Sequence, residues 1–135
     1  MKEMMYSPVR EKVKLLIKDF YKGYFFAVLS YGTHPCAYVA ISEGQPYYDI
    51  EFYENVRLSM HGGCTFTDWG LGEFFDSSYK VLGWDYGHCS DFIGYYHVES
   101  SLFKGRRWTT EEMVEDCKNV IEQLYILEHP GVFYK

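Results

Sequence analysis

The side chains best suited to chemistry lie between His61 and Asp91. Gly62 and Gly63 follow His61, so the backbone there can approach a ligand closely and turn successive N–H groups toward an anion. Thr65 adds a hydroxyl group close by. The same residues also fit a tight turn closed by a histidine, so a ligand-binding loop and a structural turn both remain open.

A second polar group follows, in which Asp85, His88 and Asp91 are spaced three residues apart. If the loops converge, His61 can join them, and two carboxylates with two imidazoles form a ligand set for a divalent metal that activates water. These groups can also be satisfied structural residues, or an Asp–His pair that acts in acid–base chemistry without metal. We expect no metal or other cofactor, and we keep the metal site as an alternative.

A basic turn, Lys104–Trp108, precedes the last amphipathic stretch. Arg106 and Arg107 could bind phosphate, and Trp108 could stack on a base. Glu111 and Glu112, which come next, would repel an anion, so a solvated basic turn is the competing interpretation.

Composition limits the class of protein. The 135 residues suit a single domain, and the aromatic share of 20% exceeds what an ordinary core needs. A formal net charge of −6 argues against binding to a nucleic-acid polymer. We see neither a membrane span nor a signal peptide, so we expect a cytoplasmic protein with four reduced cysteines. A cysteine nucleophile, Cys64 or Cys89, is a further option because both lie near histidines.

The pattern of apolar residues predicts an α+β fold. A helix should begin after Ser7–Pro8, carry its apolar face from Val9 to Phe20 and end at Gly23. A second helix should begin at the capping box of Thr109 and Glu112 and stop at His129. Between the helices we predict strands over 24–31, 36–41, 56–60 and 80–84, with the rest of 62–94 as ordered loop. The expected architecture is an antiparallel sheet with an N-terminal and a C-terminal helix packed on one side.

Three blocks of the chain resemble, in order, a family of small phage and prophage proteins. These blocks are Ala37–Ile41 with Gly44–Tyr48, His61–Gly63 with Thr65–Phe66, and Gly83–Asp85 with His88 and Asp91. The chain departs from the family pattern at Gln45, Tyr86 and Ser90, where histidine, cysteine and glycine are expected. The family is largely uncharacterised, so the resemblance implies a context more firmly than an activity.

That context is the cytoplasm of an infected bacterial host. Small acidic, aromatic-rich phage proteins include homo-oligomers that sequester nucleotide-derived immune signals of the cyclic dinucleotide or cyclic ADP-ribose type, and so counteract host defence. On this interpretation the partner is such a small molecule, and neither a nucleic-acid polymer nor a membrane is involved. The ligand-binding residues would be His61, Gly62, Gly63, Thr65, Trp84, Asp85, His88, Asp91, Arg106, Arg107 and Trp108.

Two other functions remain open. The first is a metal-dependent phosphodiesterase or related hydrolase of such nucleotides that uses His61, Asp85, His88 and Asp91. The second is a protein-binding inhibitor that presents its acidic surface to a basic host enzyme.

Overall fold

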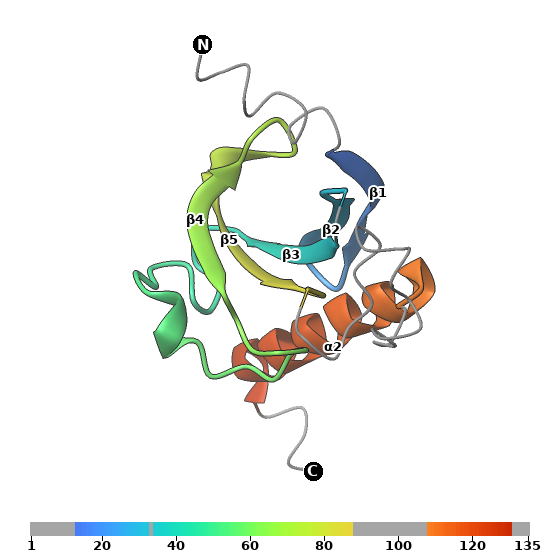
Figure 1. Ribbon diagram of the computed structural model, residues 1–135. Coiled ribbons are helices and arrows are strands. Elements are labelled where there is room, and N and C mark those ends of the chain that lie inside the picture. The colour runs from blue at the N-terminus through green and yellow to red at the C-terminus, as the bar shows by residue number, and fades with distance from the viewer. Residues whose placement is uncertain (1–12, 33, 88–107, 131–135) are drawn as a thin grey trace.

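The computed structural model describes residues 13–32, 34–87 and 108–130. Five strands form one antiparallel sheet in the order β1-β2-β3-β5-β4, and a C-terminal helix packs against it (Figure 1). The elements are β1 (Lys14–Tyr21), β2 (Tyr24–Ser30), β3 (Pro35–Ile41), the short 3-10 helix η1 (Tyr53–Asn55), β4 (Phe66–Leu71), β5 (Phe75–Asp85) and α2 (Thr110–Glu128).

The stretch expected to form the N-terminal helix is a strand where the structure describes it. Residues 14–21 form β1, an edge strand that pairs with β2, while residues 1–12 lie outside the described part of the chain. The apolar spacing misled because Ile17 and Tyr21, four residues apart, share a face of the strand as they would share a face of a helix. A bulge between Leu15 and Ile17 breaks the alternation that would have revealed the strand.

Two predictions about the strands that follow are confirmed, and one is wrong. β2 and β3 form the expected antiparallel hairpin. Residues 56–60, in contrast, belong to none of the strands. Their alternation is real, because Val56, Leu58 and Met60 are half-buried against the core, but none of the strands that the structure describes pairs with them. An extended segment lying on a core produces the same pattern as a strand.

The glycine-rich region that was expected to be mainly loop contains the β4–β5 hairpin. β4 was missed, and β5 extends well beyond the strand predicted over 80–84. Gly70 marks an irregularity in the pairing of β4 with β5, at a φ of +80°. A Cβ atom there would lie 3.0 Å from the backbone of Phe75 and Asp76, so this glycine permits close strand contact rather than a loop.

The C-terminal helix is confirmed, together with its capping box. The Thr109 side chain accepts a hydrogen bond from the Glu112 N–H (3.1 Å), and the Glu112 carboxylate accepts one from the Thr109 N–H (3.0 Å). The helix buries Met113, Cys117, Val120, Ile121 and Leu124. Among the residues that the structure describes, none of the helices combines the length and apolar character of a membrane span.

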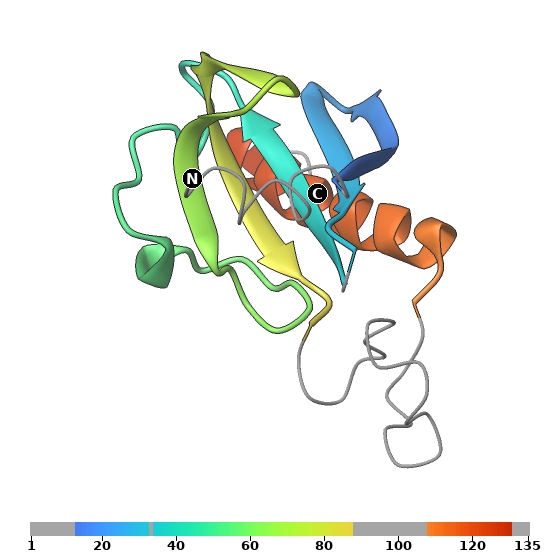
Figure 2. The same ribbon diagram turned by 45° about the horizontal axis from the view of Figure 1, so that its top comes forward.

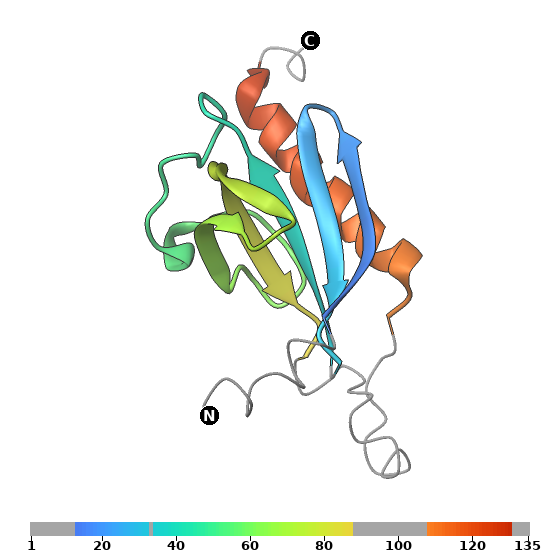
Figure 3. The ribbon, with the colours of Figure 1, turned by 90° about the horizontal axis from the view of Figure 1, so that it is seen from above.

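The two faces of the sheet support separate clusters of apolar side chains. Alternate residues of each strand point to opposite faces, so in β5 Trp84 belongs to one cluster and Val81 to the other. α2 covers the first face (Figures 2 and 3). Residues 42–65, which we call the 42–65 segment, contribute side chains to the same cluster. On the second face the sheet curls, and the Lys18 ammonium of β1 donates to the Phe74 carbonyl of the β4–β5 turn (2.7 Å).

Candidate functional site

Three aromatic rings from distant parts of the chain meet at the end of β5. The imidazole of His61 stacks on the ring of Tyr86, with centroids 4.9 Å apart and an interplanar angle of 7°. The indole of Trp108 lies against both, at 4.7 Å from His61 and 5.0 Å from Tyr86. Tyr86 is buried, whereas His61 and Trp108 are partly exposed. We call these three residues the aromatic trio.

Tyr86 is held by hydrogen bonds on two sides. Its hydroxyl group accepts from the Trp84 indole N–H (3.1 Å) and donates to the Asp116 carboxylate of α2 (2.5 Å). Burial, and then the hydrogen bond to Asp116, raise the pKa of the phenol far above its ordinary value. Tyr86 therefore stays protonated at neutral pH and fixes the trio to both the sheet and the helix.

Trp84 does not have the exposure that a stacking residue needs. Only 1% of its surface is accessible, and its single polar atom is used by Tyr86. This arises from the alternation of β5, which points Trp84 and Tyr86 to the same buried face beneath α2. The expectation that Trp84 contacts a ligand is corrected accordingly: Trp84 is a core residue that supports Tyr86.

Asp85 and Thr65 contact each other at the end of β5, where strand alternation points the Asp85 side chain to the face opposite Tyr86. The Thr65 hydroxyl group donates to one Asp85 carboxylate oxygen at 3.5 Å, and the Gly87 N–H donates to the other at 2.9 Å. The Thr65 N–H donates to the Gly83 carbonyl (2.9 Å), which fixes this residue beside β5. Thr65 is exposed and Asp85 partly exposed, so both polar groups are accessible to a small molecule.

The two glycines after His61 form a turn. Gly62 and Gly63 have φ values of +72° and +82°, a region that favours glycine, and the Gly63 N–H donates to the Met60 carbonyl (3.0 Å). That N–H group is thus engaged within the turn rather than turned toward an anion. The turn reverses the chain just after His61 and leads it back to β5 at Thr65.

The described cysteines are poorly suited to nucleophilic chemistry. Burial raises the pKa of Cys64 above its ordinary value and raises that of Cys36 to about 12. Both side chains are therefore thiols at neutral pH, and thiolate is the reactive form. Cys89, the other cysteine considered as a nucleophile, lies outside the described residues.

Four predicted site residues, His88, Asp91, Arg106 and Arg107, lie outside the described part of the chain. Within that part, no group of three or more His, Cys, Asp or Glu side chains is placed to hold a metal ion. The predicted residues that the structure does bring together are His61 with Trp108, and Thr65 with Asp85.

Sequence reasoning missed Tyr86 and Asp116 as parts of this site. Tyr86 was noted only as a departure from a family pattern that has cysteine there. The available signal was its position two residues after Trp84 at the end of a strand, which places both rings on one face. Asp116 had no local signal, because its role depends on how α2 packs.

Comparisons with protein-family models, curated proteins and solved structures return no match to this chain.

Proposed function

We propose that this chain is a small-molecule-binding protein that sequesters a nucleotide-derived immune signal of the cyclic dinucleotide or cyclic ADP-ribose type. The observation that carries the proposal is the aromatic trio, in which two partly exposed rings rest on a buried tyrosine whose hydroxyl group is hydrogen-bonded to Trp84 and Asp116. Rigid aromatic surfaces of this kind bind nucleobases by stacking, and they do so without a large loss of conformational entropy.

Thr65 and Asp85, which contact each other at the same end of β5 as the trio, carry polar groups of the kind that the rest of such a ligand needs. The Thr65 hydroxyl group can donate to or accept from a ribose hydroxyl, and the Asp85 carboxylate can accept from a ribose hydroxyl or an exocyclic amine. The proposal assigns the phosphate groups to Arg106 and Arg107, whose placement the structure does not describe. Because the chain resembles phage proteins, we also expect it to act as a homo-oligomer in an infected bacterial cell.

A binding titration with a matched pair of tryptophan variants tests the role of the trio. Purified protein is titrated with cyclic dinucleotides and cyclic ADP-ribose-type nucleotides, and the dissociation constant is measured by calorimetry. Trp108→Leu should weaken binding by about tenfold, because a base stacked on an aromatic ring contributes roughly 1–3 kcal/mol. Trp69→Leu, which removes an exposed tryptophan from β4, should leave the dissociation constant nearly unchanged.

Two results would contradict the proposal. One is the absence of saturable binding for every nucleotide in the panel. The other is an equal loss of affinity in Trp69→Leu and Trp108→Leu, since Trp69 contacts Tyr48 and Lys80 rather than the trio. Thermal unfolding of both variants must accompany the titration, because Trp108 also packs against the core.

A further inference from the structure

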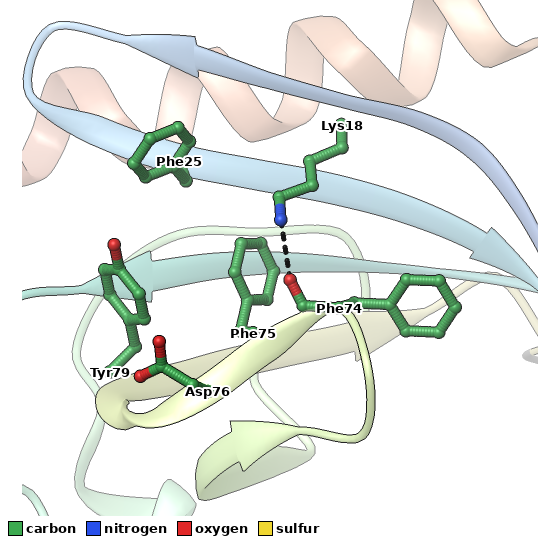
Figure 4. Close-up of a pocket in the computed structure, with 6 residues that line it drawn as sticks. All are labelled: Lys18, Phe25, Phe74, Phe75, Asp76 and Tyr79. Carbon is green, nitrogen blue, oxygen red and sulfur yellow. Dashed lines mark hydrogen bonds between the residues drawn. The ribbon is translucent and has the colours of Figure 1, made fainter.

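A cavity lies on the face of the sheet that α2 does not cover. It has a volume of about 170 Å³, is open to solvent, and lies between the β1–β2 hairpin and the β4–β5 turn (Figure 4). It is lined by Lys18, Phe25, Phe74, Phe75, Asp76 and Tyr79. Since the aromatic trio belongs to the opposite face, this cavity is independent of the site described above.

Aromatic side chains form much of the wall of this cavity, and three of their rings make edge contacts that fix their orientation. Tyr79 lies 6.2 Å from Phe25 at an interplanar angle of 82°, and 6.0 Å from Phe75 at 63°. Phe75 is 4% exposed, and Phe25 and Tyr79 are half-buried. An apolar cavity of about 150 Å³ accommodates a benzene molecule. The cavity here is similar in volume but is open and has polar groups at its edge, so it suits one ring or one branched alkyl group that also carries charged groups.

Two opposite charges stand at the edges of this aromatic cavity. The Lys18 ammonium donates to the Phe74 carbonyl at 2.7 Å and lies 4.7 Å from the centre of the Phe75 ring. One hydrogen bond leaves donors of the ammonium available, because Lys carries three. Figure 4 shows this nitrogen above Phe75 and the Asp76 carboxylate on the other side of the ring.

Asp76 is a carboxylate with one oxygen still available. The Ser78 N–H (2.8 Å) and hydroxyl group donate to the same oxygen, Oδ1, and within the described chain no hydrogen bond reaches Oδ2. The Ser78 hydrogen bonds, and to a lesser extent the charge of Lys18, lower the pKa of Asp76. The charge of Lys18 contributes to the lowered pKa of Asp76, yet the structure records no ion pair between these two described residues.

We propose that this cavity binds a free α-amino acid with a compact apolar side chain, such as phenylalanine or leucine. The side chain occupies the cavity against the rings of Phe25, Phe75 and Tyr79. The ligand carboxylate accepts from Lys18, and the ligand ammonium donates to Oδ2 of Asp76. A ligand with a single charge would leave one wall unmatched and would meet the like charge of the other, so both charges of the zwitterion are required.

A ligand panel tests this requirement on the unaltered protein. Phenylalanine is compared with 3-phenylpropionate, which lacks the ammonium, with phenethylamine, which lacks the carboxylate, and with glycine, which lacks the ring. Binding is followed by amide chemical shifts in ¹⁵N-labelled protein. We expect saturable shifts centred on residues 18, 25 and 74–79. Phenylalanine should bind about fivefold more tightly than each analogue with one charge, the scale of one exposed charge contact, and should bind more tightly than glycine because glycine buries no ring.

The panel can also overturn the proposal. It fails if phenylalanine gives no saturable shifts up to about 10 mM, beyond the range of a weak site. It fails equally if an analogue with one charge binds as tightly as phenylalanine, or if the shifts centre on residues 61–65.

Charge-removing variants locate the two contacts. Lys18→Met and Asp76→Asn should each weaken phenylalanine binding by about fivefold. The matched controls Lys14→Met on β1 and Asp68→Asn on β4, both exposed and away from the cavity, should bind as the unaltered protein does. Because Lys18 also joins β1 to the β4–β5 turn, Lys18→Arg serves as a second variant that keeps the charge and should retain binding. Equal effects of the cavity variants and their controls would overturn the assignment.

Discussion

At the scale of single residues, the arrangement of the candidate site depends on Tyr86. The His61 imidazole stacks on its ring, and its hydroxyl group forms hydrogen bonds with both the Trp84 indole and the Asp116 carboxylate. The sequence identified the neighbours Trp84 and Asp85 as unusual but could not tell which side chain faces the core. That depends on the register of β5, which is set by pairing with β3 rather than by local composition.

Removing the Tyr86 hydroxyl group should therefore cost stability. In Tyr86→Phe, the buried Trp84 N–H loses its acceptor and the Asp116 carboxylate loses its donor. We expect the free energy of unfolding to fall by about 1–3 kcal/mol, measured by urea denaturation. Tyr53→Phe, on an exposed tyrosine of η1, is the control and should change it by less than about 0.5 kcal/mol. Equal losses in the two variants would contradict this account of Tyr86.

A pH dependence follows from the contacts of Glu122 on α2. The Tyr21 hydroxyl group (2.5 Å) and the Lys22 ammonium (3.0 Å) donate to its carboxylate, and both lower its pKa below the ordinary value of 4.5. A carboxyl group with a lowered folded pKa stabilises the fold above its unfolded pKa, and this contribution disappears as pH falls through the folded pKa. Glu122→Gln should thus reduce the loss of stability between about pH 5 and pH 3.

The comparison is made by urea denaturation at several pH values. Glu54→Gln, an exposed glutamate on η1, provides a control with the same change in charge. The pH dependence of Glu54→Gln should follow that of the unaltered protein more closely than Glu122→Gln does. If both variants show the same profile, the contacts of Glu122 do not contribute to acid stability.

At the scale of elements, the sequence predicted best where one element carried its own boundary signals. The capping box defined the start of α2, and the turn after Tyr31 defined the β2–β3 hairpin. Prediction from the sequence failed for β1 and β4, which are edge strands with irregular pairing. An edge strand has one paired neighbour and large exposed surfaces, so its apolar pattern is weak.

The turn between β1 and β2 tests the revised assignment of β1. Lys22 and Gly23, with φ values of +46° and +95°, connect the paired residues Tyr21 and Tyr24 in a two-residue hairpin. A Cβ at Gly23 would have ordinary contact with Gln45 (3.7 Å), so the cost of Gly23→Ala is backbone strain. We expect a loss of about 1–2 kcal/mol in unfolding free energy.

Gly23→Asn provides the matched comparison for this turn. Asparagine adopts positive φ more readily than alanine, so this variant should lose clearly less stability than Gly23→Ala. If alanine is tolerated as well as asparagine, the turn does not have the left-handed geometry described here.

At the scale of the whole molecule, side-chain hydrogen bonds join the 42–65 segment to both the sheet and the helix. The Lys80 ammonium donates to the Ile50 carbonyl, and the Tyr48 hydroxyl group donates to the Ser78 carbonyl (3.1 Å). On α2, the Gln123 amide exchanges two hydrogen bonds with the backbone of Ser59, at 2.7 and 2.8 Å. Such long-range contacts leave no periodic trace in the sequence, so the sequence did not distinguish this extended segment from a strand.

Gln123→Ala should loosen this segment selectively. We expect hydrogen exchange at the Ser59 amide to accelerate by about three- to tenfold, while amides in β2 and β3 keep their rates. Asn119→Ala, one turn earlier on the exposed side of α2, is the control. Uniform acceleration across the sheet would show that Gln123 supports global stability instead.

The claim that the chain binds an intact nucleotide is tested most directly by recovering the ligand. The protein is incubated with cyclic dinucleotides and cyclic ADP-ribose-type signals, separated by filtration and denatured, and both fractions are analysed by mass spectrometry. We predict that an unmodified nucleotide is recovered from the protein fraction, and that Trp108→Leu retains much less of it. A cleaved product would contradict sequestration and favour a hydrolase that uses His61 and Asp85 with His88 and Asp91. If no nucleotide is bound and none is cleaved in either fraction, both would be contradicted and a protein partner would be favoured.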